Sequence, residues 1–137
     1  MTWMARPTIT SLASRRKATL AARLAAADPE VAAVVELVAA VEGVPVDKLL
    51  DPARGDSRAA AVRHLAMYLS HVMLSRPQLR VGRLFGRDRT SVSHACAQIE
   101  DRRDEADFDA HVCAIEATIL GWSEAATVPQ EAERAAG

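Results

Sequence analysis

Apolar residues recur every three or four positions along most of this sequence, in segments that end at proline or glycine. This spacing places apolar side chains on one face of an α-helix, whereas a half-buried strand would show strict alternation. The sequence contains no alternation of strand length and no internal repeat. Alanine, the strongest helix former, fills many of the intervening positions. We therefore predict an all-α fold, built as a compact helical bundle.

Proline and glycine divide the chain into predicted helical segments. Pro29 fits the first turn of a helix, Gly43 and Gly121 are expected to end helices, and Pro45 and Pro77 prevent continuation. We expect the tail 123–137 to be frayed, because it is polar and terminal. The predicted segments span about 9–27, 29–42, a short turn at 46–50, 57–74, 79–85, a helix beginning near 88, and 107–120.

Four of these segments carry apolar stripes that we expect to form the core. The stripes are Val31, Val34, Val35, Val38 and Val41; Val62, Leu65, Ala66, Leu69, Val72 and Met73; Val92, Ala95, Cys96 and Ile99; and Phe108, Val112, Ile115 and Ile119.

The net charge of −1 is an average over three unlike parts of the chain. Residues 1–51 are neutral, residues 52–103 carry ten arginines against four acidic residues, and residues 104–137 carry one arginine against eight acidic residues. A basic middle part is typical of an anion-binding surface, although solvated helix faces would give the same composition.

The apolar segments also bear on the location of the protein. No stretch of 18 consecutive apolar residues occurs, so we expect no membrane span. The first residues lack the unbroken apolar stretch of a signal peptide, which favours a cytoplasmic location. Two distant cysteines are then expected to be reduced thiols.

Residues 81–96 are the most informative stretch of the sequence, Val-Gly-Arg-Leu-Phe-Gly-Arg-Asp-Arg-Thr-Ser-Val-Ser-His-Ala-Cys. A short helix, a glycine turn and a second helix with arginine, threonine and serine at its beginning are typical of a helix–turn–helix. The first residues of such a recognition helix reach base edges in the major groove, where arginine pairs with guanine. The simpler alternative is a capped helix, with Asp88 as N-cap and its arginines in solvent.

At these residues the sequence resembles the C-terminal DNA-binding domain of DnaA, the bacterial chromosomal replication initiator. The family signature Phe-Gly-Gly-Arg-Asp-His-Thr-Thr-Val, followed by His-Ala, is matched by residues 85–96 with one glycine missing. The family pattern Ala-Arg-Gln-Ile-Ala-Met-Tyr-Leu is matched upstream by residues 62–69. The likeness covers roughly 31–120, and the sequence is similar to small alphaproteobacterial proteins that consist of this domain alone.

The resemblance implies a fold and a division of the chain. The fold would be a DnaA C-terminal domain-like, Trp-repressor-like bundle that contains the helix–turn–helix. Residues 1–30 would form an N-terminal helical extension, residues 31–122 the helix–turn–helix domain, and residues 123–137 a flexible polar tail.

The resemblance also implies which residues bind DNA. Arg87, Asp88, Thr90, Ser91 and His94 match family positions that contact the major groove or its phosphates, and Arg63 matches the arginine of the upstream motif.

Two departures from the family affect the expected DNA contacts. Arg89 stands where the family has histidine, and an arginine there would read guanine, so the preferred site would differ. The family's basic loop, whose arginine enters the minor groove, is degraded here to residues 52–58. Arg54 or Arg58 would have to substitute, although neither has the expected spacing.

Other chemistries find less support in the sequence. His94 with Cys96, and His111 with Cys113, are spaced as i and i+2 on helices, and such pairs point too far apart to chelate one metal. The acidic run Asp101–Asp109 is expected to be a solvated turn. No Gly-x-x-x-x-Gly-Lys-Ser/Thr run occurs, so we expect no ATP hydrolysis, no cofactor and no small-molecule substrate.

These observations predict a double-stranded DNA-binding protein, not an enzyme, that reads a DnaA-box-like or related site and regulates replication initiation or transcription. The alternative is a protein-interaction module that binds the replication initiator or another replication or transcription protein, with little DNA binding of its own. The degraded basic loop favours this alternative. The role of helix 9–27 stays open between phosphate contacts, a partner or dimer contact, and packing on the domain.

Overall fold

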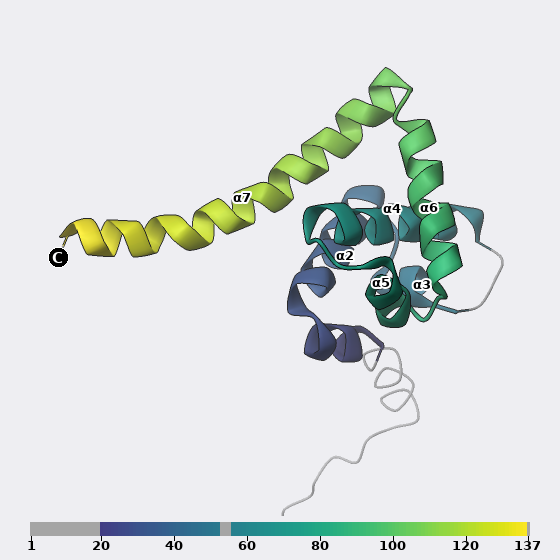
Figure 1. The fold of residues 1–137 in the computed structure, drawn as a ribbon, viewed down its shortest axis with the longest axis horizontal. Helices are drawn as coiled ribbons and strands as arrows, with labels where there is room; N and C mark the ends of the chain where they lie inside the picture. The colour runs from purple at the N-terminus through teal and green to yellow at the C-terminus, as the bar shows by residue number, and fades with distance from the viewer. Residues whose placement is uncertain (1–19, 53–55, 137) are drawn as a thin grey trace, which may run out of the picture. The chain divides into compact units, whose positions relative to one another are not determined.

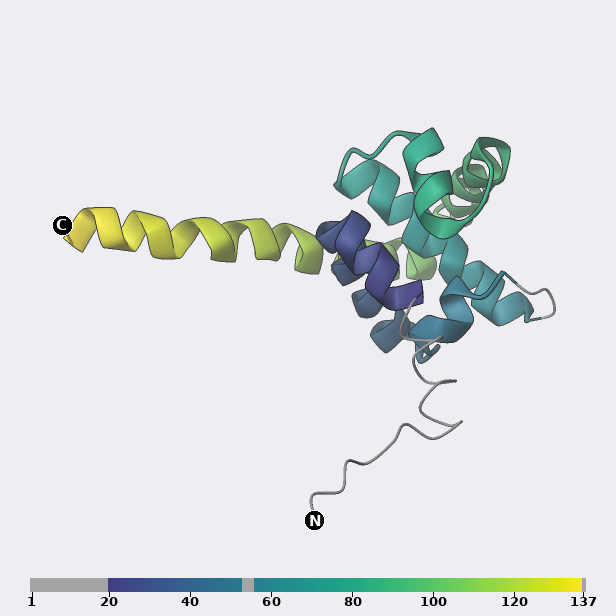
Figure 2. The ribbon, with the colours of Figure 1, turned by 90° about the horizontal axis from the view of Figure 1, so that it is seen from below.

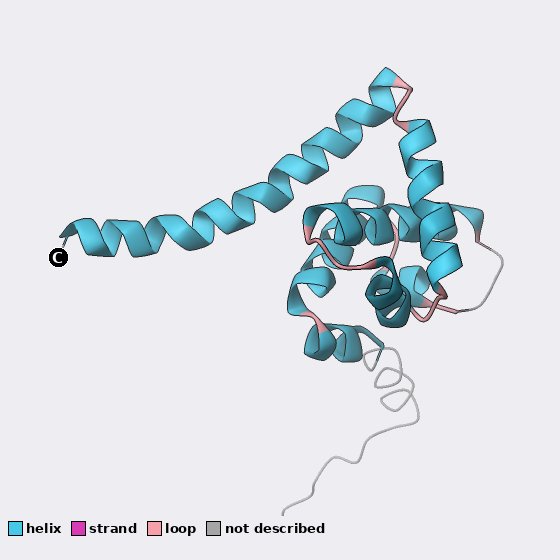
Figure 3. Ribbon diagram, viewed as in Figure 1, coloured by secondary structure: helices cyan, strands magenta, loops and turns pink. Residues whose placement is uncertain are grey.

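The computed structural model describes residues 20–52 and 56–136, with side chains described as far as residue 123. Within these ranges the regular secondary structure is entirely helical (Figure 3), which confirms the all-α prediction. Residues 20–27 are helical, and the rest of the predicted helix 9–27 lies outside the described residues. The helices that follow are α2 (Pro29–Glu42), α3 (Val46–Leu50), α4 (Ser57–Met73), α5 (Gln78–Phe85), α6 (Arg89–Arg102) and α7 (Ala106–Ala136), labelled in Figure 1.

Capping residues and proline set the ends of α2 as the sequence predicts. The Asp28 carboxylate accepts a hydrogen bond from the Val31 N–H at 3.2 Å, and Pro29 occupies the first turn. At the other end Gly43 has a φ of 69°, a left-handed conformation that glycine adopts without steric cost. Pro45 then separates α2 from α3.

The chain divides into two units, one ending at Arg63 and the other beginning at His64, so the division falls within α4. In the first unit α2 contacts α3. In the second unit α5 contacts α6. The division into an extension, a domain and a tail, predicted from the resemblance, stays a prediction.

The predicted apolar stripes are buried with four exceptions: Met73 and Phe108 are half-buried, and Val41 and Val72 are exposed. Val41 and Val72 are 46% and 41% exposed, although helical spacing assigned both to the core. Each is the second-last residue of its helix. The core residues of these stripes are Val31, Val34, Val35, Val38, Val62, Leu65, Ala66, Leu69, Val92, Ala95, Cys96, Ile99, Val112, Ile115 and Ile119.

The last helix is longer than the sequence predicts. We expected it to stop at Gly121, but α7 continues to Ala136, and Figures 1 and 2 both show it as one uninterrupted helix. A glycine inside a helix costs only about 1 kcal/mol relative to alanine. The segment after Gly121 contains alanines and glutamates, which are strong helix formers, and also Pro129, which lacks a backbone N–H. None of the described helices is long and apolar enough to span a membrane.

Candidate nucleic-acid interface

The turn between α5 and α6 is closed by two glycines. Gly86 ends α5 with a φ of 67°, and the Arg87 N–H donates a hydrogen bond to the Gly82 carbonyl at 2.7 Å. The Arg87 carbonyl passes so close to Gly82 that a Cβ there would lie 2.5 Å from this oxygen. Because Gly82 has no side chain, the backbone of the turn can pack directly against α5. The family signature has two consecutive glycines after the phenylalanine, whereas here Gly86 alone follows Phe85 and takes the left-handed conformation.

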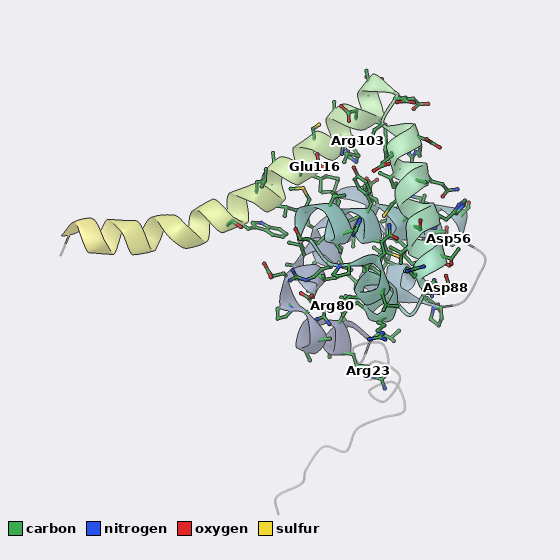
Figure 4. The ribbon with its side chains drawn as sticks, viewed as in Figure 1. Arg23, Asp56, Arg80, Asp88, Arg103 and Glu116 are labelled. Atoms are coloured by element: carbon green, nitrogen blue, oxygen red, sulfur yellow. The ribbon has the colours of Figure 1, made fainter. Side chains whose placement is uncertain are left out.

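Asp88 caps the beginning of α6 (Figure 4). Its Oδ1 accepts a hydrogen bond from the Ser91 N–H at 2.7 Å. This bond, with further hydrogen bonds from the Ser91 side chain and the Thr90 N–H, lowers the pKa of Asp88 below its ordinary value. The residue is therefore ionised at neutral pH and fixes the direction in which α6 leaves the turn.

The lowered pKa of Asp88 predicts acid-sensitive stability. An acid with a folded-state pKa below its unfolded value stabilises the fold above the unfolded pKa, and this contribution disappears as pH falls through the folded pKa. Asp88→Ala should therefore lower Tm at pH 7, and the difference from wild type should shrink steadily below about pH 4, near the ordinary pKa of an aspartate. Thermal unfolding followed by circular dichroism between pH 2 and 7 measures this. Asp88→Asn is the control, because it keeps an oxygen acceptor and should retain most of the Tm at pH 7; a Tm difference for Asp88→Ala that is constant with pH would contradict the prediction.

The α6 helix has one buried face and one exposed face. Val92, Ala95, Cys96 and Ile99 are buried, as their i, i+3, i+4, i+7 spacing predicts. The first two turns of the opposite face are exposed and carry the predicted DNA-binding side chains. The apolar residues thus hold α6 in place while its polar residues face solvent. The exposed residues are Arg89, Thr90, Ser91, Ser93, His94 and Ala97.

The structure brings six of the predicted site residues together around the start of α6: Arg87, Asp88, Arg89, Thr90, Ser91 and His94. Arg87 is half-buried, and its Nη1 lies 3.4 Å from the Gly86 carbonyl oxygen. Arg89 is exposed and occupies the first position of α6.

The three remaining candidates belong to the unit that ends at Arg63. Arg54 lies outside the described residues. Arg58 donates a hydrogen bond to the Glu42 carbonyl at the end of α2, and Arg63 donates one to the Leu49 carbonyl at 3.4 Å. Carbonyls in the last turn of a helix have no partner within that helix. Arg58 and Arg63 therefore each satisfy a carbonyl near the end of a helix in this unit. A DNA contact from either arginine stays a prediction.

Sequence reasoning missed the role of Arg103. We expected the run Asp101–Asp109 to be a solvated turn, but the Arg103 side chain is only 19% exposed and links three helices of its unit. Its Nε donates to Asp109 at 2.6 Å, and its two terminal nitrogens donate to Glu116 at 3.0 and 3.1 Å. Its Nη1 also donates to the Tyr68 hydroxyl at 3.1 Å.

The network around Arg103 changes the electrostatics of its side chain, and no pattern of neighbouring residues predicts the network. The carboxylates of Glu116 and Asp109 stabilise the guanidinium and raise the pKa of Arg103 above its ordinary value. The charge of Arg103 is thereby neutralised locally, so it adds little to the basic surface counted from the sequence. Its partners stand 6, 13 and 35 positions away, separations that helical periodicity does not relate to one another.

The histidines and cysteines are dispersed. Cys96 is buried and Cys113 is exposed, and burial raises the pKa of the Cys96 thiol. Among the described residues, no three side chains of the metal-binding types converge on one point.

Comparison with known proteins places this site in a wider group. Residues 31–99 match the family model of the bacterial DnaA protein helix-turn-helix. A chromosomal replication initiator protein DnaA from Bifidobacterium animalis subsp. lactis is 37% identical over 73 residues, which make up 53% of this chain and 12% of that relative. The similarity therefore includes α2 to α6 and only a small part of the initiator.

Proposed function

Since the chain belongs to the bacterial DnaA helix-turn-helix family, we propose that it binds double-stranded DNA by inserting the first turns of α6 into the major groove. The family supports DNA binding in general. The more specific proposal is that the chain reads a DnaA-box-like or related site and regulates replication initiation or transcription. Binding alone, without a catalytic step or cofactor, is sufficient for this role.

One observation carries the proposal. Arg89 and the matched residues Thr90, Ser91 and His94 are exposed together on one side of α6, while the opposite side is buried. A recognition helix needs this arrangement, because its exposed N-terminal residues must reach base edges without disturbing the core. The positive end of the α6 helix dipole also favours nearby phosphates.

The salt dependence of binding tests the proposal. We expect fluorescence anisotropy with labelled duplexes, selected from a random pool, to show affinity that falls steeply as salt rises. The slope of log affinity against log salt should be about −0.9 per phosphate contact, because each contact releases condensed counterions. Binding that does not depend on salt, or no binding to any duplex, would refute the proposal.

Arg89 tests whether α6 reads sequence. Arg89→Ala should cost about 1–3 kcal/mol on the best site and should relax the preference at one base pair, because arginine donates two hydrogen bonds to guanine. Arg89→Lys is the matched control, since it keeps the charge and loses the paired geometry. It should restore general affinity but not the base preference. An equal loss on all sequences would instead make Arg89 a phosphate contact.

The biological process is tested separately. Genome-wide mapping of bound DNA should return a short motif related to the DnaA box, concentrated near the replication origin or near promoters. The alternative, a module that binds the replication initiator or another protein, would be supported by a partner that survives nuclease treatment together with no duplex binding. That combination would exclude the DNA-reading role.

A further inference from the structure

Gln98 is an exposed residue of α6 that lies beyond the family signature, which covers residues 85–96 of this chain. The signature therefore assigns it no role. Within the described part of the chain, the side-chain amide of Gln98 makes no hydrogen bond. This amide carries two donors and one acceptor, so its whole hydrogen-bonding capacity is available to a ligand.

Gln98 continues a stripe of polar side chains along α6. Ser91, His94 and Gln98 stand at positions i, i+3 and i+7, so they lie on one side of the helix, and all three are exposed. Seven residues of helix rise by about 10.5 Å, which is less than the width of the major groove, about 12 Å. A groove that takes the start of α6 can therefore also accommodate Gln98.

The charges around Gln98 disfavour a phosphate contact. Glu100 and Asp101 are exposed, and the Arg102 guanidinium lies over the Phe108 ring, 3.9 Å from its centre. Two negative charges against one positive charge leave this end of α6 negative, and a phosphate brought here would be repelled. The edge of a base is uncharged, so it is a better partner for the Gln98 amide than a phosphate.

We propose that Gln98 reads an adenine in the major groove, as a second specificity-determining residue beside Arg89. This inference rests on the proposed function and deepens it. Glutamine pairs with adenine through two hydrogen bonds, because its N–H donates to N7 while its oxygen accepts from the N6 amino group. The preferred duplex should therefore contain one A·T pair whose recognition depends on residue 98.

The test measures the affinity of the full chain and of two variants, Gln98→Ala and Gln98→Met, for the selected duplex and for duplexes with each base pair changed in turn. Wild type should bind about 5- to 150-fold more weakly when the A·T pair is replaced, the discrimination expected of a paired contact. Both variants should lose this preference and keep the preferences at the other base pairs. Methionine is the matched control, because it is similar in size and helix propensity but lacks the amide; circular dichroism verifies that the helix content is intact.

Gln98→Lys separates a base contact from a phosphate contact. Lysine pairs with guanine, so beside a base it should change the preference at this pair from A·T to G·C. Beside a phosphate it would instead raise the affinity for every duplex equally and steepen the salt slope by about 0.9. That second result would overturn the inference.

The alanine variant can also overturn it. If Gln98→Ala binds every duplex as wild type does, or loses affinity equally on all of them, Gln98 reads no base, while DNA binding by the start of α6 stands. If the wild-type chain binds no duplex, the proposed function itself fails, and the role of Gln98 fails with it.

Discussion

Replacing Gly82 with alanine should destabilise the protein by about 2 kcal/mol and weaken duplex binding on every sequence. The added methyl group would lie 2.5 Å from the Arg87 carbonyl oxygen, which belongs to the backbone of the turn. Overpacking of this kind costs about 1–3 kcal/mol. In addition the turn must move, and α6 with it, so the residues proposed to read bases lose their position. Urea unfolding and duplex titration measure the two effects.

Gly121 provides a matched control for this substitution. It also lies within a helix, but a Cβ there would meet nothing within 4 Å. Gly121→Ala should therefore stabilise the protein by up to about 1 kcal/mol, since alanine has the higher helix propensity. The same glycine-to-alanine change should therefore lower the free energy of unfolding at position 82 and raise it at position 121. If both variants were more stable than wild type, the close approach of the Arg87 carbonyl to Gly82 would not limit the residue at position 82.

Loss of the Arg103 side chain should have the second large effect. Arg103→Ala removes hydrogen bonds to Glu116, Asp109 and Tyr68 and leaves two carboxylates without their cation. Hydrogen bonds to charged groups are worth about 1.5–3 kcal/mol when sheltered, and the Asp109 contact counts for less because that side chain is 43% exposed. We expect a destabilisation of about 2–3 kcal/mol, measured by urea unfolding.

The neighbouring arginine separates this effect from a simple change of charge. Arg102 is exposed and lies 3.9 Å from the centre of the Phe108 ring. An exposed cation–π contact is worth about 0.5–1 kcal/mol, so Arg102→Ala should cost far less than Arg103→Ala. Equal losses in the two variants would show that net charge, and not the network, determines stability. Glu116→Gln should reproduce part of the Arg103→Ala loss, because it removes the charge of the main partner.

The local features of the fold could be predicted from the sequence because they depend on neighbouring residues. Asp28 and Asp88 cap helices within three positions, and the spacing of Val92 to Ile99 gives the buried face of α6 directly. The exposed group from Arg89 to His94 follows from that same periodicity. Resemblance to a family was needed to propose that this group reads DNA, because a capped helix with solvent-exposed arginines has the same pattern.

The features that could not be predicted depend on the approach of distant segments. Nothing in the sequence distinguishes Gly82, which must lack a side chain, from Gly121, which need not. The helical stripe extends to Val41 and Val72, but burial requires a neighbour, and both are exposed at the ends of their helices. The partners of Arg103 come from two other helices, α4 and α7, so a residue counted toward the basic middle part of the chain proved to be a structural one.

The close contact between Gly82 and the turn also has a thermodynamic consequence for binding. A recognition helix that is already fixed on its partner helix loses little conformational entropy when it meets DNA, so less of the contact energy is spent on ordering the protein. Association should therefore proceed as the docking of a preformed surface, with a small heat-capacity change that reflects the contact area alone. Isothermal titration at several temperatures would distinguish this from folding coupled to binding, which gives a heat-capacity change several times larger.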